Sequence, residues 1–152
     1  YPAVAEFDLS EQICGCLLQF EELWEKKTID IETDIEEGIR ILSDAELLSL
    51  VCNNLFSNAI KFTEPGGTVS VGLHTEGDWI AVRMSDTGCG MSPEVGSHIF
   101  EKFYQGDTSH ATQGNGLGLA LVKRVVDILQ GEITVESVLG EGSTFVVKFR
   151  GH

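Results

Sequence analysis

Apolar residues recur along the chain with two periodicities, that of an α-helix and the alternation of a β-strand. Helical spacing predicts a helix over 10–26 capped by Ser10, a helix from the capping-box pattern at 43–46 to Phe62, and a helix over 116–130 that stops at Gly131. Alternation predicts strands near 28–35, 39–41, 69–73, 80–84, 132–138 and 143–149. A short helix is expected after Ser92 and a long loop over 104–115.

Helices and hairpin strands intermix in this pattern without regular β-α-β crossovers. The order favours an α+β fold, in which helices form a layer on one face of a mixed sheet. A length of 152 residues suits one domain of ordinary size and is too short for two separate cores. We therefore expect a single domain over 1–152.

Charge narrows the possible functions. The chain has 24 acidic and 10 basic residues, a formal charge of −14, which argues against nucleic acid as a partner and against contact with anionic membranes. Residues 1–48 carry a net charge of −10 and the remaining residues only −4. The acidic first third is interpreted either as a solvated surface or as a surface that faces a partner.

The cysteines and the ends of the chain indicate its compartment. Cys14 and Cys16 lie in an amphipathic helical pattern and Cys52 lies among apolar residues, as buried free thiols do. No zinc-type spacing, signal peptide or transmembrane run is present, so we expect a reducing, cytoplasmic environment, with the parent protein free or anchored in a plasma membrane. The chain begins without Met, and we expect it to be a piece of a longer protein.

Three candidate motifs follow one another along the chain. In the first, Asn54, Asn58 and Lys61 share one stripe of the long helix, and the opposite stripe is apolar. Amide oxygens beside a lysine suit Mg²⁺ with a phosphate group, because Mg²⁺ takes hard oxygen ligands. The alternative is an ordinary polar helix face.

The second motif is Asp86-Thr87-Gly88-Cys89-Gly90-Met91, directly after a predicted strand. Gly88 and Gly90 would let the backbone approach a flat ligand, and Asp86 could accept a hydrogen bond from an exocyclic amine. A plain turn at the end of a hairpin strand is the alternative interpretation.

The third motif, residues 114–121, runs from the long loop into a helix and holds Gly114, Gly116 and Gly118. Glycines before a helix N-terminus expose amides to an anion. The motif is not a dinucleotide-binding fingerprint, because Leu119 stands where a third glycine should be. It is not a P-loop either, because the chain contains no Gly-Lys pair.

Taken together and in this order, the motifs resemble those of sensor histidine kinases. Residues 50–63 resemble the asparagine box of that family, residues 86–91 its first glycine box, residues 100–105 its phenylalanine box and residues 114–121 its second glycine box. The resemblance covers nearly the whole chain and implies the Bergerat ATP-binding fold, a two-layer α/β sandwich that DNA gyrase, a chaperone class and mismatch-repair ATPases share.

The resemblance also implies roles for individual residues. Asn58 would be the magnesium ligand, Asn54 would lie near the triphosphate and Lys61 would contact phosphate. Asp86 would bond the adenine amino group, Thr144 would sit behind the adenine, and Tyr104 would approach from a lid over 102–114. The other implied nucleotide-binding positions are Gly88, Gly90, Met91, Gly114, Gly116, Leu117, Gly118 and Leu119.

The resemblance implies ATP and Mg²⁺ as cofactors and phosphoryl transfer to a histidine on a separate dimerisation domain, followed by relay to a response regulator. None of the four histidines here lies in the family's acceptor context, so we expect the dimerisation, acceptor and sensor domains to lie outside this chain. Two positions depart from the family pattern. Gln105 replaces a common arginine and brings no charge, so the neutralisation of phosphate would rest on Mg²⁺, Lys61 and Lys102. Lys102 itself stands where proline is common.

Two rival hypotheses stay open at the level of the sequence. The first is a degenerate nucleotide-binding module that regulates a partner without phosphotransfer, which Gln105 and Lys102 leave possible. The second is an ATPase or serine kinase of the same superfamily. A gyrase-like hydrolase would need a glutamate base at the place of Asn54, and an amide cannot abstract a proton.

Overall fold

Five strands form the main sheet of the computed structural model, which describes residues 2–91, 99–100 and 117–151. They lie in the order β2-β4-β5-β7-β6, with bounds Asp30–Ile35 (β2), Thr68–Glu76 (β4), Trp79–Asp86 (β5), Glu132–Val138 (β6) and Gly142–Arg150 (β7). β2 and β4 pair in parallel, and the other neighbours are antiparallel. The expected mixed, mostly antiparallel sheet is therefore confirmed.

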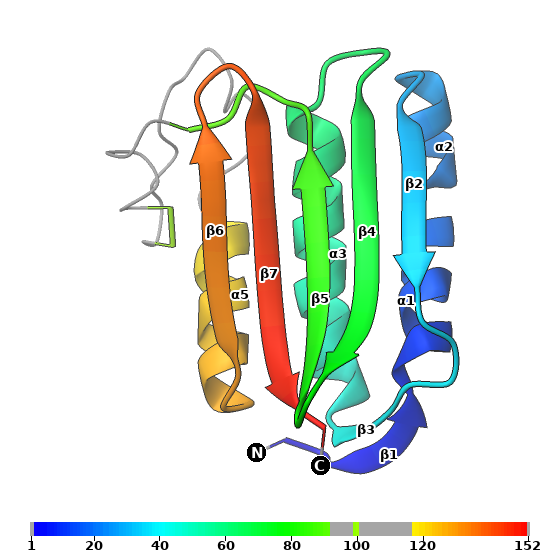
Figure 1. The fold of residues 1–152 in the computed structure, drawn as a ribbon, viewed down its shortest axis with the longest axis vertical. Coiled ribbons are helices and arrows are strands. Elements are labelled where there is room, and N and C mark those ends of the chain that lie inside the picture. Colours follow the sequence, from blue (N-terminus) through cyan, green and yellow to red (C-terminus); the bar gives the residue numbers. More distant parts are fainter. Residues whose placement is uncertain (1, 92–98, 101–116, 152) are drawn as a thin grey trace.

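The described helices all cover one face of this sheet, as Figure 1 shows. They are α1 (Leu9–Leu18), α2 (Glu21–Lys26), α3 (Ala45–Phe62) and α5 (Leu117–Ile128). A separate two-stranded sheet pairs β1 (Ala5–Asp8) with β3 (Arg40–Ser43). The pattern of the sequence did not predict β1. The two-layer α/β sandwich expected for the family is confirmed.

The core lies between the two layers. The apolar stripe of α3 is buried, and Phe56 at its centre is fully inaccessible to solvent. Alternate residues of β4 and β5 meet this stripe because successive side chains of a strand point to opposite faces. The opposite face of the sheet carries mainly small and charged side chains.

The first predicted helix is wrong in one respect, because residues 10–26 form two helices instead of one. The chain leaves helical geometry at Phe20, and the bend lets the rings of Phe20 and Trp24 both meet Phe56 edge to face, at centroid distances of 5.6 and 5.9 Å. Asp8 caps α1 in place of Ser10. The Ser10 hydroxyl instead donates to the Glu36 carbonyl at 2.6 Å.

Two helix ends also differ from their predictions by one residue. Asp44, not Ser43, caps α3, and its carboxylate accepts from the Leu47 N–H at 3.1 Å. After α5 the left-handed residue is Gln130, with φ +59°, and not Gly131. Gly131 is required for another reason: a Cβ there would lie 2.6 Å from the Lys148 carbonyl oxygen.

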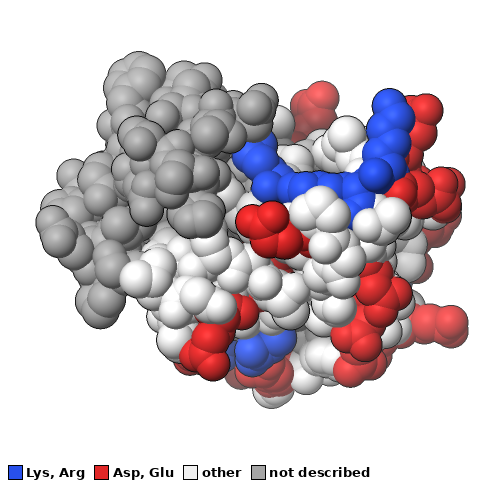
Figure 2. All heavy atoms as spheres, turned by 90° about the horizontal axis from the view of Figure 1, so that it is seen from above, with Lys and Arg blue, Asp and Glu red and all other residues white. Residues whose placement is uncertain are grey.

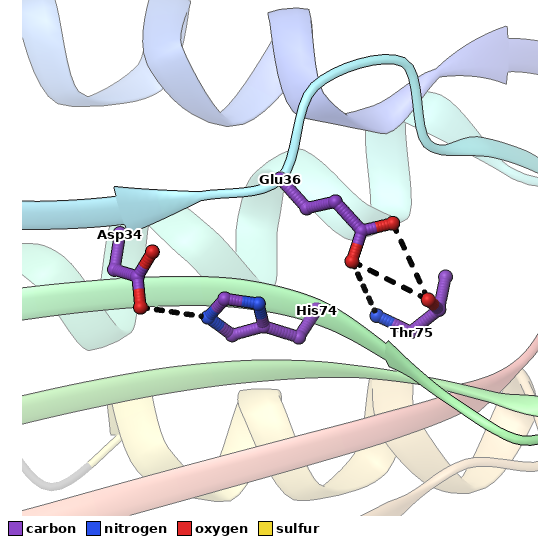
Figure 3. Close-up of polar contacts among 4 residues, drawn as sticks. All are labelled: Asp34, Glu36, His74 and Thr75. Atoms are coloured by element: carbon purple, nitrogen blue, oxygen red, sulfur yellow. Dashed lines mark hydrogen bonds and ion pairs between the residues drawn. The ribbon is translucent and has the colours of Figure 1, made fainter.

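Polar contacts fasten β2 and the residue after it to the neighbouring strand β4 (Figure 3). His74 Nε2 lies 3.1 Å from Asp34 Oδ2. The Thr75 N–H and hydroxyl both donate to the Glu36 carboxylate, at 3.3–3.4 Å. These contacts supplement the parallel ladder, which is the only strand pairing of β2 among the described residues.

The structure places the three cysteines that were predicted to be buried. Cys16 and Cys52 are buried and outside any disulfide, as predicted, whereas Cys14 is exposed, which corrects its prediction as a buried thiol. Cys14 lies on the solvent side of α1, two residues from the core position of Cys16. None of the described helices is long and apolar enough to cross a membrane.

Candidate functional site

Most of the predicted site residues that the structure describes lie at or near one end of the sandwich. β5 ends there, α3 ends there, and the β6–β7 turn lies beside them (Figure 1). Side chains from α3, β5, β7 and the first turn of α5 surround this end.

α3 supplies a polar stripe that runs along the site. Asn54, Asn58 and Lys61 are half-buried, in contrast to the buried apolar stripe on the other side of the helix. Seven residues at 1.5 Å per residue place the first and last of these positions about 10 Å apart along the helix axis. The predicted stripe is thus confirmed as a geometric feature.

Gly118, in the first turn of α5, approaches this stripe closely. A Cβ at this position would lie 2.9 Å from Asn54 Oδ1 and 4.0 Å from Asn58 Nδ2. The Asn54 amide group is oriented by a hydrogen bond of 2.7 Å from its nitrogen to the Leu50 carbonyl, which leaves its oxygen toward α5. The absence of a side chain at Gly118 therefore keeps open a space lined by two amide groups.

Asp86, the last residue of β5, is half-buried. Its Oδ1 accepts a hydrogen bond from the Gly88 N–H at 2.9 Å. Burial raises the pKa of the Asp86 carboxyl group, and hydrogen bonds from the backbone of Gly88 and Ser143 offset part of this effect. At neutral pH the residue is a desolvated hydrogen-bond acceptor, which suits it to bind a ligand N–H group.

The glycines around Asp86 are required by the protein's own backbone. A Cβ at Gly88 would overlap the Phe62 carbonyl at the end of α3. Gly90, with φ +66°, and Gly142, with φ +134°, lie against the carbonyls of Val138 and Asp86, respectively. These approaches lock the end of β5 to α3 and to the β6–β7 hairpin, a different reason for the glycines from the close ligand approach predicted.

Thr144 is not brought to the Asp86 side of the sheet, which corrects its predicted place. It pairs in register with Ser85, and their hydroxyls lie 2.9 Å apart on the face away from the helices. Ser143 is the residue directly opposite Asp86, on the same face. Adjacent strand residues point to opposite faces, so Ser143 shares the face of Asp86 and Thr144 does not, a distinction that the sequence alone did not make.

Lys27 is a further residue at this end that the sequence pattern did not suggest. Its Nζ donates to the carbonyl oxygens of Ile60 and Lys61, at 2.9 and 2.8 Å. It thereby satisfies two carbonyls at the negative end of the α3 dipole. Figure 2 shows Lys and Arg side chains in a row at this end of the molecule, and Lys26, Lys27 and Lys61 are the basic residues at the described helix ends there.

The structure describes only some of the remaining predicted positions. Leu119 is half-buried and packs against the hydrophobic core. Met91 is half-buried, and its N–H donates to the Ser137 hydroxyl at 2.7 Å. The described residues do not include Tyr104, Gly114, Gly116, the short helix expected after Ser92 or the side chain of Leu117.

Asn54 and Asn58 offer the kind of ligand that the magnesium ion implied by the resemblance would take. Amide oxygens are hard ligands of the kind that Mg²⁺ accepts, and the space beside Gly118 would be filled by any Cβ. No group of three or more His, Cys, Asp or Glu residues suited to a metal occurs in the described ranges. The residues present therefore fit an ion that takes most of its ligands from phosphate and water.

Comparison with known proteins places this site in a family. Residues 43–151 match the model of the histidine kinase-, DNA gyrase B- and HSP90-like ATPases. The chain is 40% identical over 149 residues to the circadian input-output histidine kinase CikA of Synechococcus elongatus, covering 95% of this chain but only 20% of CikA.

Solved histidine kinases share the fold. Full-length ShkA in complex with AMPPNP superposes with a TM-score of 0.87 at 28% identity, over 100% of this chain and 32% of ShkA. ThkA in complex with the response regulator TrrA gives a TM-score of 0.83 at 25% identity, over 98% of this chain and 42% of ThkA. The chain therefore belongs to the histidine kinase-, DNA gyrase B- and HSP90-like ATPases, as an ATPase catalytic domain of the two-component sensor kinase type.

Proposed function

We propose that this domain binds ATP with Mg²⁺ along the polar stripe of α3 and presents the γ-phosphate to a histidine on a separate dimerisation domain. The observation that carries the proposal is the arrangement of Asp86 at one end of the stripe and the Asn54–Gly118 contact at the other. The base would bond to Asp86 and the phosphates would extend toward Asn58 and Gly118. A bound Mg²⁺ ion would neutralise phosphate charge.

The residues of this chain would act by position and by charge. Lys61 would contact phosphate, and Asn58 and Asn54 would hold the triphosphate end through their amide groups. In the transfer step the bond between the γ-phosphorus and its bridging oxygen breaks as a bond to the acceptor histidine nitrogen forms, and ADP leaves. ThkA, which is solved in complex with the response regulator TrrA, supports a response regulator as the partner in the following relay step.

The decisive experiment measures ATP binding by calorimetry with and without Mg²⁺. We expect Asn58→Ala to weaken binding of Mg-ATP by about tenfold or more and to abolish its dependence on Mg²⁺. Asn53→Ala is the matched control, because Asn53 lies on the same helix but its Oδ1 accepts from Cys16 on α1 at 2.9 Å. Absence of binding to the unaltered domain at millimolar ATP would refute the proposal.

A further inference from the structure

Ser137, near the end of β6, makes three contacts at the site through one hydroxyl group. Its Oγ accepts from the Met91 N–H at 2.7 Å, donates to the Gly142 carbonyl at 3.1 Å and lies 2.8 Å from Ser143 Oγ. A second bond, from the Gly140 N–H to the Cys89 carbonyl at 2.7 Å, joins the same two segments. Ser137 thus ties the segment after Asp86 to the β6–β7 hairpin.

The chemistry of a hydroxyl fixes the direction of each of these bonds. A hydroxyl has one proton and two acceptor lone pairs. A carbonyl can only accept and an N–H can only donate, so the Ser137 proton goes to Gly142 and one lone pair goes to Met91. With the Ser137 proton on the Gly142 carbonyl, the Ser143 hydroxyl is the donor in the contact between the two serines.

This direction determines what Ser143 can offer to a ligand. Ser143 lies opposite Asp86 on the same face of the sheet, and its remaining lone pairs can only accept. Asp86 as a carboxylate also only accepts. The two side chains together form a surface of acceptors, which suits the 6-amino group of adenine and opposes the 6-oxo group of hypoxanthine or guanine.

We propose that Ser137 is a positioning residue that holds the Gly90-Met91 backbone against the β6–β7 hairpin and keeps Ser143 as an acceptor, so that the site prefers a 6-amino purine. The proposal rests on the proposed function, in which the base lies at Asp86. Ser137 itself does not contact the nucleotide. Its effect passes through Ser143 and through the backbone of Met91.

The test compares ATP and ITP, which differ at the 6-position of the base, as calorimetric ligands of the 152-residue chain. We expect Ser137→Ala to weaken ATP binding about tenfold and to lower the preference for ATP over ITP by at least about threefold, because the Ser143 proton becomes available to a 6-oxo group. Ser137→Thr keeps the hydroxyl and should restore both values to within about twofold.

Ser85→Ala is the matched control. It removes a hydroxyl that bonds to Thr144 at 2.9 Å between the same strands β5 and β7, one residue from Asp86 but on the opposite face. Both nucleotide affinities should stay within about twofold of the unaltered chain. An unchanged ATP-to-ITP ratio in Ser137→Ala would overturn the proposal, even if both affinities fell together. If the unaltered chain bound neither nucleotide, the proposed function itself would fail.

Discussion

Asp86 is held in surroundings that oppose its own charge. Burial at the end of β5 raises the pKa of the carboxyl group, although hydrogen bonds from backbone N–H groups partly compensate. No described side chain forms an ion pair with Asp86. A partly desolvated carboxyl group of this kind is suited to binding, because a ligand N–H group would add a hydrogen bond to those from the backbone.

We predict that Asp86→Asn changes stability and binding in opposite directions. The folded pKa lies above the unfolded value of about 3.9, so the stabilising contribution of Asp86 is complete below that pH and is lost as the pH rises through the folded pKa. At pH 7 the nucleotide-free variant should therefore unfold at a higher urea concentration. Its amide oxygen stays with the Gly88 N–H, its amide nitrogen meets the adenine amino group, and ATP affinity should fall about tenfold or more.

Asp44→Asn is the control in the same urea experiment, and we expect its change in stability to have the opposite sign. Hydrogen bonds from the backbone of Leu47 and Ala3 lower the pKa of Asp44, so its contribution is present above about pH 3.9 and is lost as the pH falls through the folded pKa. Asn caps helices about as well as Asp through its amide oxygen. Its amide nitrogen, however, replaces the oxygen that accepts from the Ala3 N–H, so the substitution removes the charge together with one hydrogen bond. The variant should be less stable at pH 7, with the difference shrinking in acid. Destabilisation by Asp86→Asn at pH 7 would contradict the account.

At the scale of elements, α3 runs from one end of the site to the other. Its contact with α5 depends on the absence of a side chain at Gly118. Gly118 lets the first turn of α5 lie against Asn54 and Asn58. Helical glycine ordinarily costs about 1 kcal/mol relative to alanine. The close approach to the two amides accounts for a glycine at this position, whereas the helical propensity of the sequence does not.

Gly118→Ala should therefore weaken ATP binding about tenfold, because the new Cβ lies 2.9 Å from Asn54 Oδ1 and displaces that amide. The gain in helix propensity should limit the change in the free energy of unfolding to about 1 kcal/mol in either direction. Gly15→Ala in α1 is the matched control, since nothing lies within 4 Å of its Cβ position. It should stabilise the domain by up to about 1 kcal/mol and leave ATP binding unchanged, as thermal unfolding and calorimetry would show. Equal ATP affinities of the two variants would contradict this role of Gly118.

The sequence predicted the elements that bury one large face, because such a face leaves a clear periodicity of apolar residues in the sequence. α3, β4 and β5 belong to this group, and their buried residues match the pattern. The break at Phe20 has no glycine or proline to mark it, and Leu17, Phe20 and Trp24 keep helical spacing across it. β1 was missed because its four residues are half-buried at most and, within the described part of the chain, pair with β3 alone.

Within the site, the sequence predicted the residues of linear motifs and missed those that act through the fold. Asn58 and Asp86 stand in recognisable boxes. Lys27 reaches the end of α3 from another helix, and Ser137 reaches Met91 across 46 positions of sequence. Such contacts depend on tertiary packing, which no local spacing records.

At the scale of the whole molecule, the charge of −14 must coexist with an anionic ligand. Most of that charge lies in residues 1–48, in which α2 and β2 bear many of the acidic side chains. Lys27 and Lys61 lie instead at the end of α3. The acidic residues therefore repel one another over the folded surface, whereas the site keeps its own local positive charge.

This distribution predicts that salt stabilises the nucleotide-free domain. Self-repulsion at −14 is felt over about 30 Å at 0.01 M ionic strength and over about 10 Å at 0.1 M, so the Tm at pH 7 should rise by several degrees between 10 and 300 mM NaCl. Replacing two exposed acids, Glu25→Gln with Glu37→Gln, should raise the Tm at low salt and reduce its salt dependence. The pair Glu25→Asp with Glu37→Asp keeps the charge and should behave like the unaltered chain. A Tm that falls with salt, or equal salt slopes in the two double variants, would show that self-repulsion does not limit stability.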